Sequence, residues 1–153
     1  MGVFYLHAEQ LLQVEIQTAW AFFSSPNNLA LITPPEMGFI TLTPMAEGQE
    51  IYPGMLIDYT VKPLFGIPLH WRTEIRHVQK PHSFSDIQLK GPYRLWEHTH
   101  TFTQTDKGVL MKDEVKYQLP FGAIGHLANS LLVRKKLEAL FRYRKAAIER
   151  IFK

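Results

Sequence analysis

Two histidines at alternating positions of one predicted strand, and an aspartate in the next strand, are the residues best placed to do chemistry. One residue separates His98 from His100, so in a strand both side chains project to the same side. If residues 105–108 form a four-residue hairpin, the register places His100 opposite Asp113. The spacing therefore predicts a histidine–aspartate pair on one face of a sheet.

This group of side chains has three interpretations. Two imidazoles and a carboxylate could complete a three-ligand metal shell. His100 could instead act as a general base that Asp113 orients, although a base also needs a substrate proton within reach. The third interpretation is a buried, satisfied pair that orients the sheet and offers a hydrogen bond to a ligand. We favour the third, expect no bound metal and no cofactor, and keep His100 and Asp113 as the catalytic candidates.

The elements that position this group follow from the apolar pattern. Two short helices are predicted at residues 18–23 and about 27–32, and one long amphipathic helix at 124–152. The last six strands have no helix-length crossover between them, so they must pair antiparallel. We predict an α+β fold with a single domain over residues 1–153, in which a curved seven-stranded antiparallel sheet wraps round the long helix. The predicted strands are residues 3–14, 38–43, 54–62, 69–79, 83–90, 93–104 and 109–117.

Strand alternation identifies the side chains that face the helix. In the strand at 83–90 we place Phe84, Asp86 and Gln88 on this inner face. The face is aromatic but also carries histidine and aspartate, a mixture typical of ligand pockets rather than of helix-covered cores. We therefore predict a hydrophobic small-molecule ligand between sheet and helix. Its predicted contacts are Tyr59, Trp71, Thr73, Phe84, Trp96, His98, His100, Phe102, Met111, Asp113, Val115 and Tyr117.

The long helix carries both an apolar stripe and many cations. The cations are explained most simply by their preference for a helix C-terminus and its outer face, although an acidic membrane or nucleic acid must be considered. The apolar loop at 63–68 could be an entrance lid, an oligomer contact or a loop packed on the helix. The stripe expected to face the sheet is Leu127, Leu131, Val133, Leu137, Leu140, Phe141, Ile148 and Ile151. The basic residues are Arg134, Lys135, Lys136, Arg142, Arg144, Lys145 and Arg150.

Composition excludes several classes of protein. The chain has no cysteine, which excludes disulfides, zinc–thiolate sites, iron–sulfur clusters and cysteine nucleophiles. No basic segment followed by an apolar stretch opens the sequence, and no apolar run approaches the ~18 residues of a membrane span. We therefore expect a cytoplasmic protein without an integral membrane segment. The formal charge is +3, but no zinc finger, aromatic RNA-binding motif or glycine-rich phosphate loop is present, so we expect no nucleic-acid partner.

Several short segments together suggest a family. They are FFSSPNNL (22–29), ITPP (32–35), WRTEI (71–75), GPY (91–93), WEHTHTF (96–102), DEV (113–115) and LPFG (119–122). With these segments the chain resembles, over nearly its full length, small bacterial members of the SRPBCC or START-like superfamily. Their helix-grip fold is shared with birch-pollen-allergen-like proteins and polyketide cyclases. The resemblance implies a cavity for a lipid, polyketide, quinone or similar compound, but no catalytic motif that could be transferred to this chain.

Three functions remain open at this point. The first hypothesis is binding or carriage of an apolar small molecule between the sheet and the helix. The second is a cyclase, dehydratase or hydrolase that uses His100 and Asp113 for proton transfer. The third is an accessory protein that docks a partner through its basic C-terminal helix.

Overall fold

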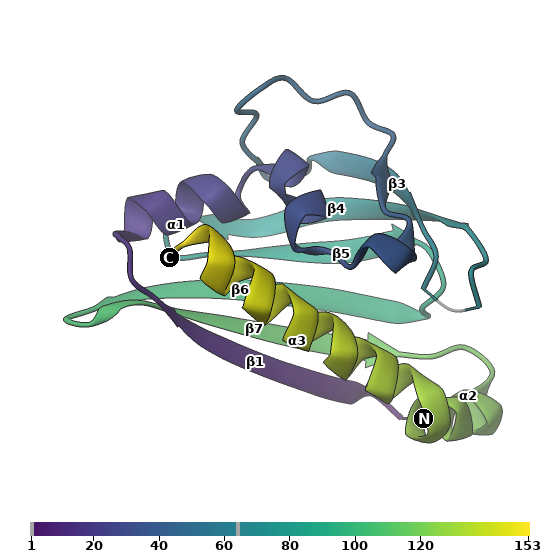
Figure 1. Cartoon of the computed structure of the whole chain (residues 1–153). Helices are drawn as coiled ribbons and strands as arrows, with labels where there is room; N and C mark the ends of the chain where they lie inside the picture. Colours follow the sequence, from purple (N-terminus) through teal and green to yellow (C-terminus); the bar gives the residue numbers. More distant parts are fainter. Residues whose placement is uncertain (1, 64) are drawn as a thin grey trace.

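The protein is built on one sheet that a long helix crosses (Figure 1). The computed structural model describes residues 2–63 and 65–153. This architecture confirms the predicted α+β class with seven strands, two short helices after the first strand and a long C-terminal helix. The strands are β1 (Phe4–Leu12), β2 (Ile40–Thr41), β3 (Leu56–Val61), β4 (Leu69–Gln79), β5 (Ser83–Lys90), β6 (Leu95–Thr105) and β7 (Gly108–Gln118). The helices are α1 (Ile16–Phe23), the 3₁₀ helices η1 (Pro26–Ile32) and η2 (Pro35–Met37), α2 (Gly122–Ala128), the π turn η3 (Asn129–Val133) and α3 (Arg134–Ile151).

The sheet has the order β1-β7-β6-β5-β4-β3-β2, and all its neighbouring strands are antiparallel. In the β6–β7 hairpin His100 pairs with Asp113, which is the predicted register. The turn is shorter than the predicted four residues, because Thr105 and Gly108 also pair and leave only Asp106 and Lys107 between the strands. Gly108, the first residue after the hairpin turn, has a φ of 128°. A Cβ at this position would lie 2.3 Å from the Leu12 carbonyl oxygen. Only glycine therefore allows the hairpin to approach the end of β1 so closely.

Strand β2 is shorter than the predicted strand at residues 38–43. The backbone N–H groups of Leu42 and Thr43 both donate to the carbonyl oxygen of Asp58. Two consecutive donors on one acceptor interrupt the ladder, because regular pairing needs a new acceptor at every second residue. The second predicted helix, at about residues 27–32, is present but is the 3₁₀ helix η1, which begins at Pro26.

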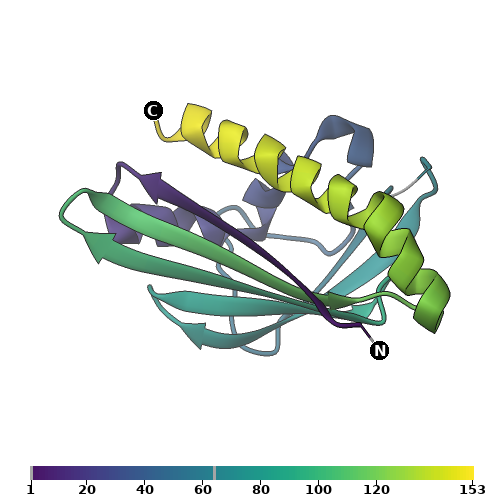
Figure 2. The ribbon, with the colours of Figure 1, turned by 90° about the horizontal axis from the view of Figure 1, so that it is seen from below.

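The segments α2, η3 and α3 form one long helix that lies across the concave face of the sheet (Figures 1 and 2). No helix in the described part of the chain is long and apolar enough to span a membrane. The predicted inward stripe is correct only from Val133 onward, because Leu127 and Leu131 are exposed, as is Ile151 at the far end. The π turn puts the preceding residues out of phase with α3. From α2 to the middle of α3, the residues that are buried against the sheet follow one another every four positions. They are Gly125, Asn129, Val133, Leu137 and Phe141.

Two apolar clusters form the core between sheet and helices. One lies under α1 and the C-terminal end of α3 and includes Trp20, Phe102 and Ile148. The other lies under the first turns of α3 and includes Trp96 and Tyr117. Polar side chains of β5, β6 and β7 occupy the space between the clusters.

Candidate functional site

Asp113, buried on β7, joins two histidines of β6. The distance from Asp113 Oδ1 is 2.8 Å to His98 Nε2 and 3.1 Å to His100 Nδ1. Strand alternation places both imidazoles on the inner face, and the β6–β7 register brings the carboxylate to them. The structure therefore brings together all three residues that the sequence analysis selected, with one carboxylate oxygen shared by two rings.

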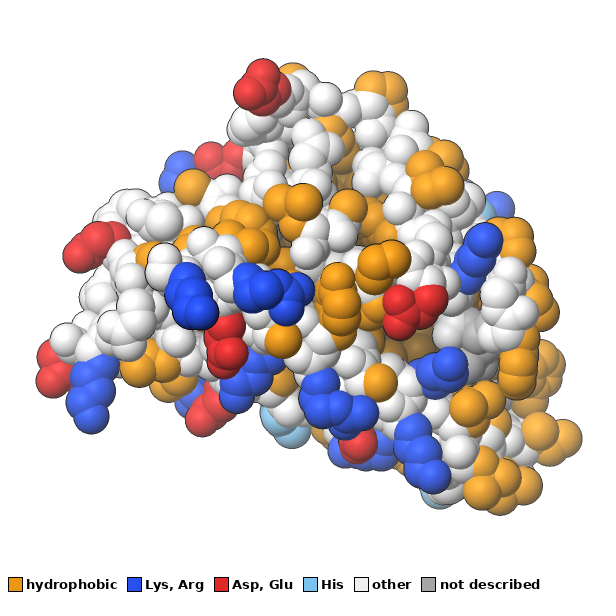
Figure 3. Space-filling view, in the orientation of Figure 1, with side chains coloured by type: hydrophobic (Ala, Val, Ile, Leu, Met, Phe, Trp, Pro, Cys, Tyr) orange, Lys and Arg blue, Asp and Glu red, His pale blue; other side chains and the backbone are white. Residues whose placement is uncertain are grey.

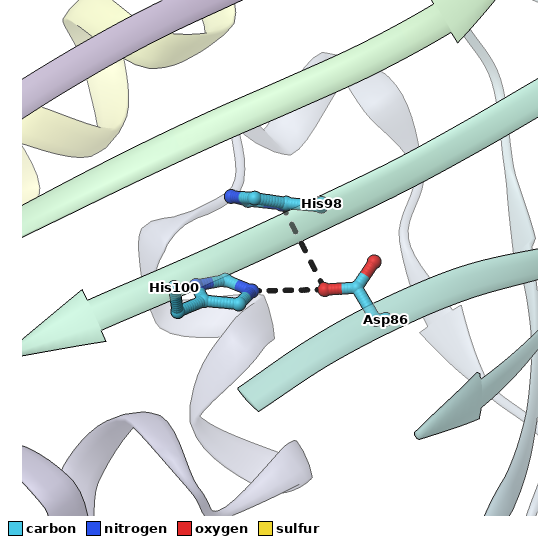
Figure 4. A group of neighbouring side chains, drawn as sticks. All are labelled: Asp86, His98 and His100. Atoms are coloured by element: carbon cyan, nitrogen blue, oxygen red, sulfur yellow. Dashed lines mark hydrogen bonds and ion pairs between the residues drawn. The ribbon is translucent and has the colours of Figure 1, made fainter. Parts of the chain in front are cut away.

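A second carboxylate, Asp86 on β5, closes this network from the other side (Figure 4). Its Oδ2 atom lies 2.9 Å from His100 Nε2 and 3.7 Å from His98 Nδ1. His100 therefore has a carboxylate at each ring nitrogen, and only a protonated imidazolium can donate at both. His98 donates from Nε2 to Asp113, which leaves its Nδ1 free of a proton.

The surroundings give the two histidines different charges. Burial lowers the pKa of His100, but hydrogen bonds and charges from Asp113 and Asp86 outweigh it and raise the pKa to about 9. Burial dominates at His98 and, together with the positive charge of His100, holds its pKa below the ordinary value. Burial raises the pKa of both aspartates, but the histidines lower it further, so both carboxylates stay ionised. At neutral pH His100 is thus cationic and His98 is neutral.

This geometry bears on the metal and base interpretations. One ring nitrogen of His98, one of His100 and an oxygen of Asp86 lie within 4.8 Å of one another, so Asp86 rather than Asp113 would complete a metal shell. The imidazoles, however, stack with centroids 3.8 Å apart and planes inclined by 28°. A metal lies in the ring plane about 2.0–2.1 Å from each nitrogen, so the stacked rings would have to turn apart to share one. His100 is also protonated, and so is suited to donate a proton rather than to accept one.

Arg144 reaches this group from α3. Its Nε atom is buried, and no acceptor within residues 2–63 and 65–153 forms a hydrogen bond with it. Burial lowers the Arg144 pKa while the charges of Asp113 and Asp86 raise it, and a guanidinium stays charged in proteins. A buried donor without a partner costs about 1–3 kcal/mol. The Nε–H group therefore marks a place where an acceptor atom would be stabilised.

A cavity of about 40 Å³ lies beside these side chains. Its polar side consists of His100, Asp113 and Arg144. In this state the cavity has room for no more than a few water molecules. The opposite side comes from α1, η1 and the turn between them, and consists of Phe22, Phe23, Ser25, Asn28, Leu29 and Ile32.

The raised pKa of His100 predicts a pH-dependent stability. The charged groups around it are Asp86 on β5, Asp113 on β7 and Arg144 on α3. The native state holds the His100 proton more tightly than the unfolded chain. Its stabilising effect is therefore complete below the unfolded pKa of about 6.5. It is lost as the pH rises through the folded value of about 9.

A glutamine at position 100 cannot titrate, so His100→Gln should remove this part of the pH dependence. Urea denaturation of both proteins on either side of the two pKa values, at about pH 6 and about pH 9.5, measures the difference. The native protein should lose more unfolding free energy over this interval than the variant. Equal losses would show that His100 is not a titrating cation in the folded state.

The structure places the predicted ligand contacts in different surroundings. His100 and Asp113 line the cavity. Thr73 is buried between the Tyr59 hydroxyl and the Trp71 ring nitrogen, at 2.7 and 3.1 Å. Which of these residues contact a ligand stays a prediction. The remaining apolar ones pack in the core, Phe84, Phe102 and Met111 in the first cluster and Trp96, Val115 and Tyr117 in the second.

Gln88 pairs with the buried Thr73, so it lies on the predicted inner face. Its side-chain amide donates to the carbonyl of Tyr93 at 2.7 Å and accepts from the backbone N–H of Tyr93 at 3.0 Å. It therefore holds the turn between β5 and β6.

Arg144 was missed because all basic residues of the helix were assigned to the outer face. A signal was present in the spacing. Leu137, Phe141 and Ile148 belong to the buried stripe, and Arg144 lies three residues after Phe141 and four before Ile148. Residues at these spacings share one side of a helix, so the pattern could have placed Arg144 inside.

No protein-family model matches the sequence, and no curated protein matches it. Solved structures do match its fold. A START superfamily protein from Mycobacterium smegmatis superposes with a TM-score of 0.68 at 12% identity, covering 97% of this chain and 98% of that one. Protein CV1439 from Chromobacterium violaceum gives 0.70 at 10% identity, covering 97% and 96%. Ara h 8.0201 gives 0.60 at 13% identity, covering 96% and 98%.

At these identities the similarity is one of fold alone. The matched features are the curved seven-stranded antiparallel sheet and the long C-terminal helix. The chain therefore has the helix-grip fold of START-like structures, as its sequence resemblance predicted.

Proposed function

We propose that this chain binds a neutral, largely apolar molecule whose oxygen accepts a hydrogen bond from Arg144. The observation that carries the proposal is the buried Nε–H of Arg144, which has no acceptor in the described chain. An apolar wall that faces a few convergent polar groups is typical of small-molecule sites. Quinones, aromatic polyketides and lipid esters all carry a suitable oxygen on an apolar body.

The charges around the cavity favour a neutral ligand over an ionised one. His100 and Arg144 supply two positive charges, and Asp86 and Asp113 supply two negative ones. These charges cancel. A carboxylate ligand would leave one negative charge unbalanced in a buried site, which is costly. A carbonyl or hydroxyl oxygen satisfies the donor without this cost.

A ligand of ordinary size has to widen the cavity. The sheet side is held by strand ladders on both neighbours of β6. The other side is the 3₁₀ helix η1, whose hydrogen-bond geometry is intrinsically poorer than that of an α-helix. The side-chain bonds from Asn28 to the Phe22 carbonyl and from Thr33 to the Leu29 carbonyl join α1 and η1 internally and do not reach the sheet, so the segment can shift as a unit. We therefore expect α1 and η1, rather than the sheet, to move when a ligand enters.

Three probes of similar shape test the proposal: naphthalene, 1-acetonaphthone and 1-naphthoate. Naphthalene offers no acceptor, 1-acetonaphthone offers a neutral carbonyl oxygen, and 1-naphthoate offers an ionised carboxylate. We expect the ketone to bind most tightly and to raise the melting temperature most, since a ligand that binds only the native state stabilises it. Arg144→Met keeps the side-chain length but removes the donor, so it should weaken ketone binding roughly tenfold or more.

The same substitution at the exposed Arg142 on α3 is the matched control, and should leave binding unchanged. Naphthalene should bind the native protein and Arg144→Met equally. The proposal is wrong if naphthalene binds as tightly as the ketone, or if Arg144→Met retains full ketone affinity while circular dichroism shows it folded.

A further inference from the structure

The outer side of the long helix carries an apolar ridge at its N-terminal end. Ile124, Leu127 and Leu131 follow one another at spacings of three and four residues, which places them on one side of the helix. Phe121 immediately precedes α2. The four side chains are between 60% and 79% exposed. Apolar side chains of this size are rarely grouped on a surface without a partner.

The fold holds this ridge outward. The opposite side of α2 is pressed against the preceding segment, and a Cβ at Gly125 would lie 2.1 Å from the carbonyl oxygen of Pro120. Asn129, one turn later, is buried and accepts a hydrogen bond of 2.6 Å from the Tyr117 hydroxyl. These two contacts fix the rotation of α2 and η3. The ridge cannot turn inward without breaking both contacts.

The β3–β4 loop adds apolar surface at the same end of the molecule, as the two ribbon views agree (Figures 1 and 2). Phe65 and Ile67 in this loop are exposed. Figure 3 shows hydrophobic side chains gathered at this end, with Lys and Arg side chains beside those over α2. We call Phe65, Ile67, Phe121, Ile124, Leu127 and Leu131 together the apolar end.

Positive charges outnumber negative ones around the apolar end. Residues 115–137 contain Lys116, Arg134, Lys135 and Lys136 but no Asp or Glu, although Arg134 is paired with Glu138 at 3.2 Å. Residues 59–73, which span the loop, contain Lys62 and Arg72 and no Asp or Glu, but Arg72 is paired with Asp58 at 2.9 Å. Among the residues that the structure describes, the unpaired surplus at this end is therefore supplied by lysines. Lys135 lies four residues after Leu131, so the cations begin where the ridge ends. The end thus combines exposed apolar side chains with a rim of cations.

We propose that the apolar end docks reversibly on a membrane surface that carries anionic lipid headgroups. Apolar side chains of a surface-lying helix enter the boundary between headgroups and acyl chains, and flanking lysines are attracted to anionic lipids. Pairing with a second copy through the same surface would place the cations of the two copies close together. This inference concerns a surface distant from Arg144 and does not depend on the ligand.

Vesicle sedimentation tests the proposal. The probes are vesicles of phosphatidylcholine alone and of equal parts phosphatidylcholine and phosphatidylglycerol. The native protein should sediment with the mixed vesicles and much less with phosphatidylcholine. Replacing Lys135 and Lys136 by Gln should lower binding to mixed vesicles by about thirtyfold. The matched control replaces Lys107 and Lys112, exposed cations on the β6–β7 hairpin, and should have a smaller effect.

The ridge is tested by replacing Leu127 and Leu131 with serine, which should lower vesicle binding roughly tenfold or more. The same change at Leu31 and Leu42, which are also exposed, is the control. Because the chain has no native cysteine, Ile124→Cys can carry a polarity-sensitive fluorophore as an independent readout. Its emission should shift to the blue on mixed vesicles, whereas a label at Leu31→Cys should not respond.

Three outcomes would overturn the proposal. The first is equal sedimentation with both vesicle types. The second is an unresponsive label at position 124. The third is a dimer, seen by sedimentation velocity, that dissociates when Leu127 and Leu131 are replaced, since the ridge would then be covered by a second copy.

Discussion

Replacing Asp113 by alanine is expected to lower the free energy of unfolding by about 3–5 kcal/mol, the range for removing one partner of a buried ion pair. The carboxylate is shared by His98 and His100, so its loss removes a hydrogen bond to His98 and an ion pair with His100 at once. It also leaves the positive charges of His100 and Arg144 facing only Asp86. Urea denaturation near neutral pH measures the effect.

The neighbouring residue Glu114 provides a matched control. It lies on the opposite face of β7 and is exposed, and its Oε2 atom lies 3.6 Å from His7 Nδ1. Glu114→Ala should therefore change stability by less than about 1 kcal/mol. Adding His100→Leu to Asp113→Ala should restore part of the lost stability, because it removes the buried cation. A loss below about 1 kcal/mol for Asp113→Ala would contradict the charge network described here.

Phe102→Ala is expected to cost about 3–5 kcal/mol through the cavity it leaves. The ring is 1% exposed. Ring centroids of Trp20, Phe23 and Phe84 lie 5.5–6.5 Å away, on helix α1 and strand β5. Removing the Phe102 ring would remove these packing contacts between α1 and the sheet. Thermal and urea unfolding followed by circular dichroism give the change in stability.

Phe121→Ala is the control for this truncation, because the chemistry is the same and the ring is 79% exposed. It should leave stability within about 0.5 kcal/mol of the native value. Comparable losses for the two variants would mean that Phe121 is packed in solution. Such a result would also weaken the case for the apolar end as a free surface.

The fold could be predicted because its main signals are local. Alternating apolar residues and a short symmetric hairpin were enough to place His100 opposite Asp113, because a turn of two residues gives the same register as the predicted turn of four. Boundaries were less accurate where the decisive interaction is distant, as at β2, where the Asp58 carbonyl accepts from both Leu42 and Thr43. The helix stripe was wrong before Val133, because a π turn leaves no clear mark in the sequence.

The site was predicted only in part, for a related reason. Alternation within β6 identified His98 and His100, and the hairpin identified Asp113. The role of Asp86 depends on the pairing of β5 with β6, and its carboxylate reaches diagonally to His100 although its pairing partner is His98. Arg144 comes from an element with no local tie to the sheet. Neither position could be derived from a turn length.

The orientation of the apolar ridge depends on the π turn at Asn129–Val133, and the loss of a single codon would remove this turn. Such a turn holds one residue more than an α-helical turn. Deleting Ser130 in frame would restore regular winding and rotate the preceding helix by about 100° relative to α3. Gly125 would then no longer pack against the Pro120 carbonyl. The side chains of Ile124 and Leu127 would point in a different direction. One insertion or deletion event in evolution is thus enough to redirect this surface while α3 and the sheet keep their packing.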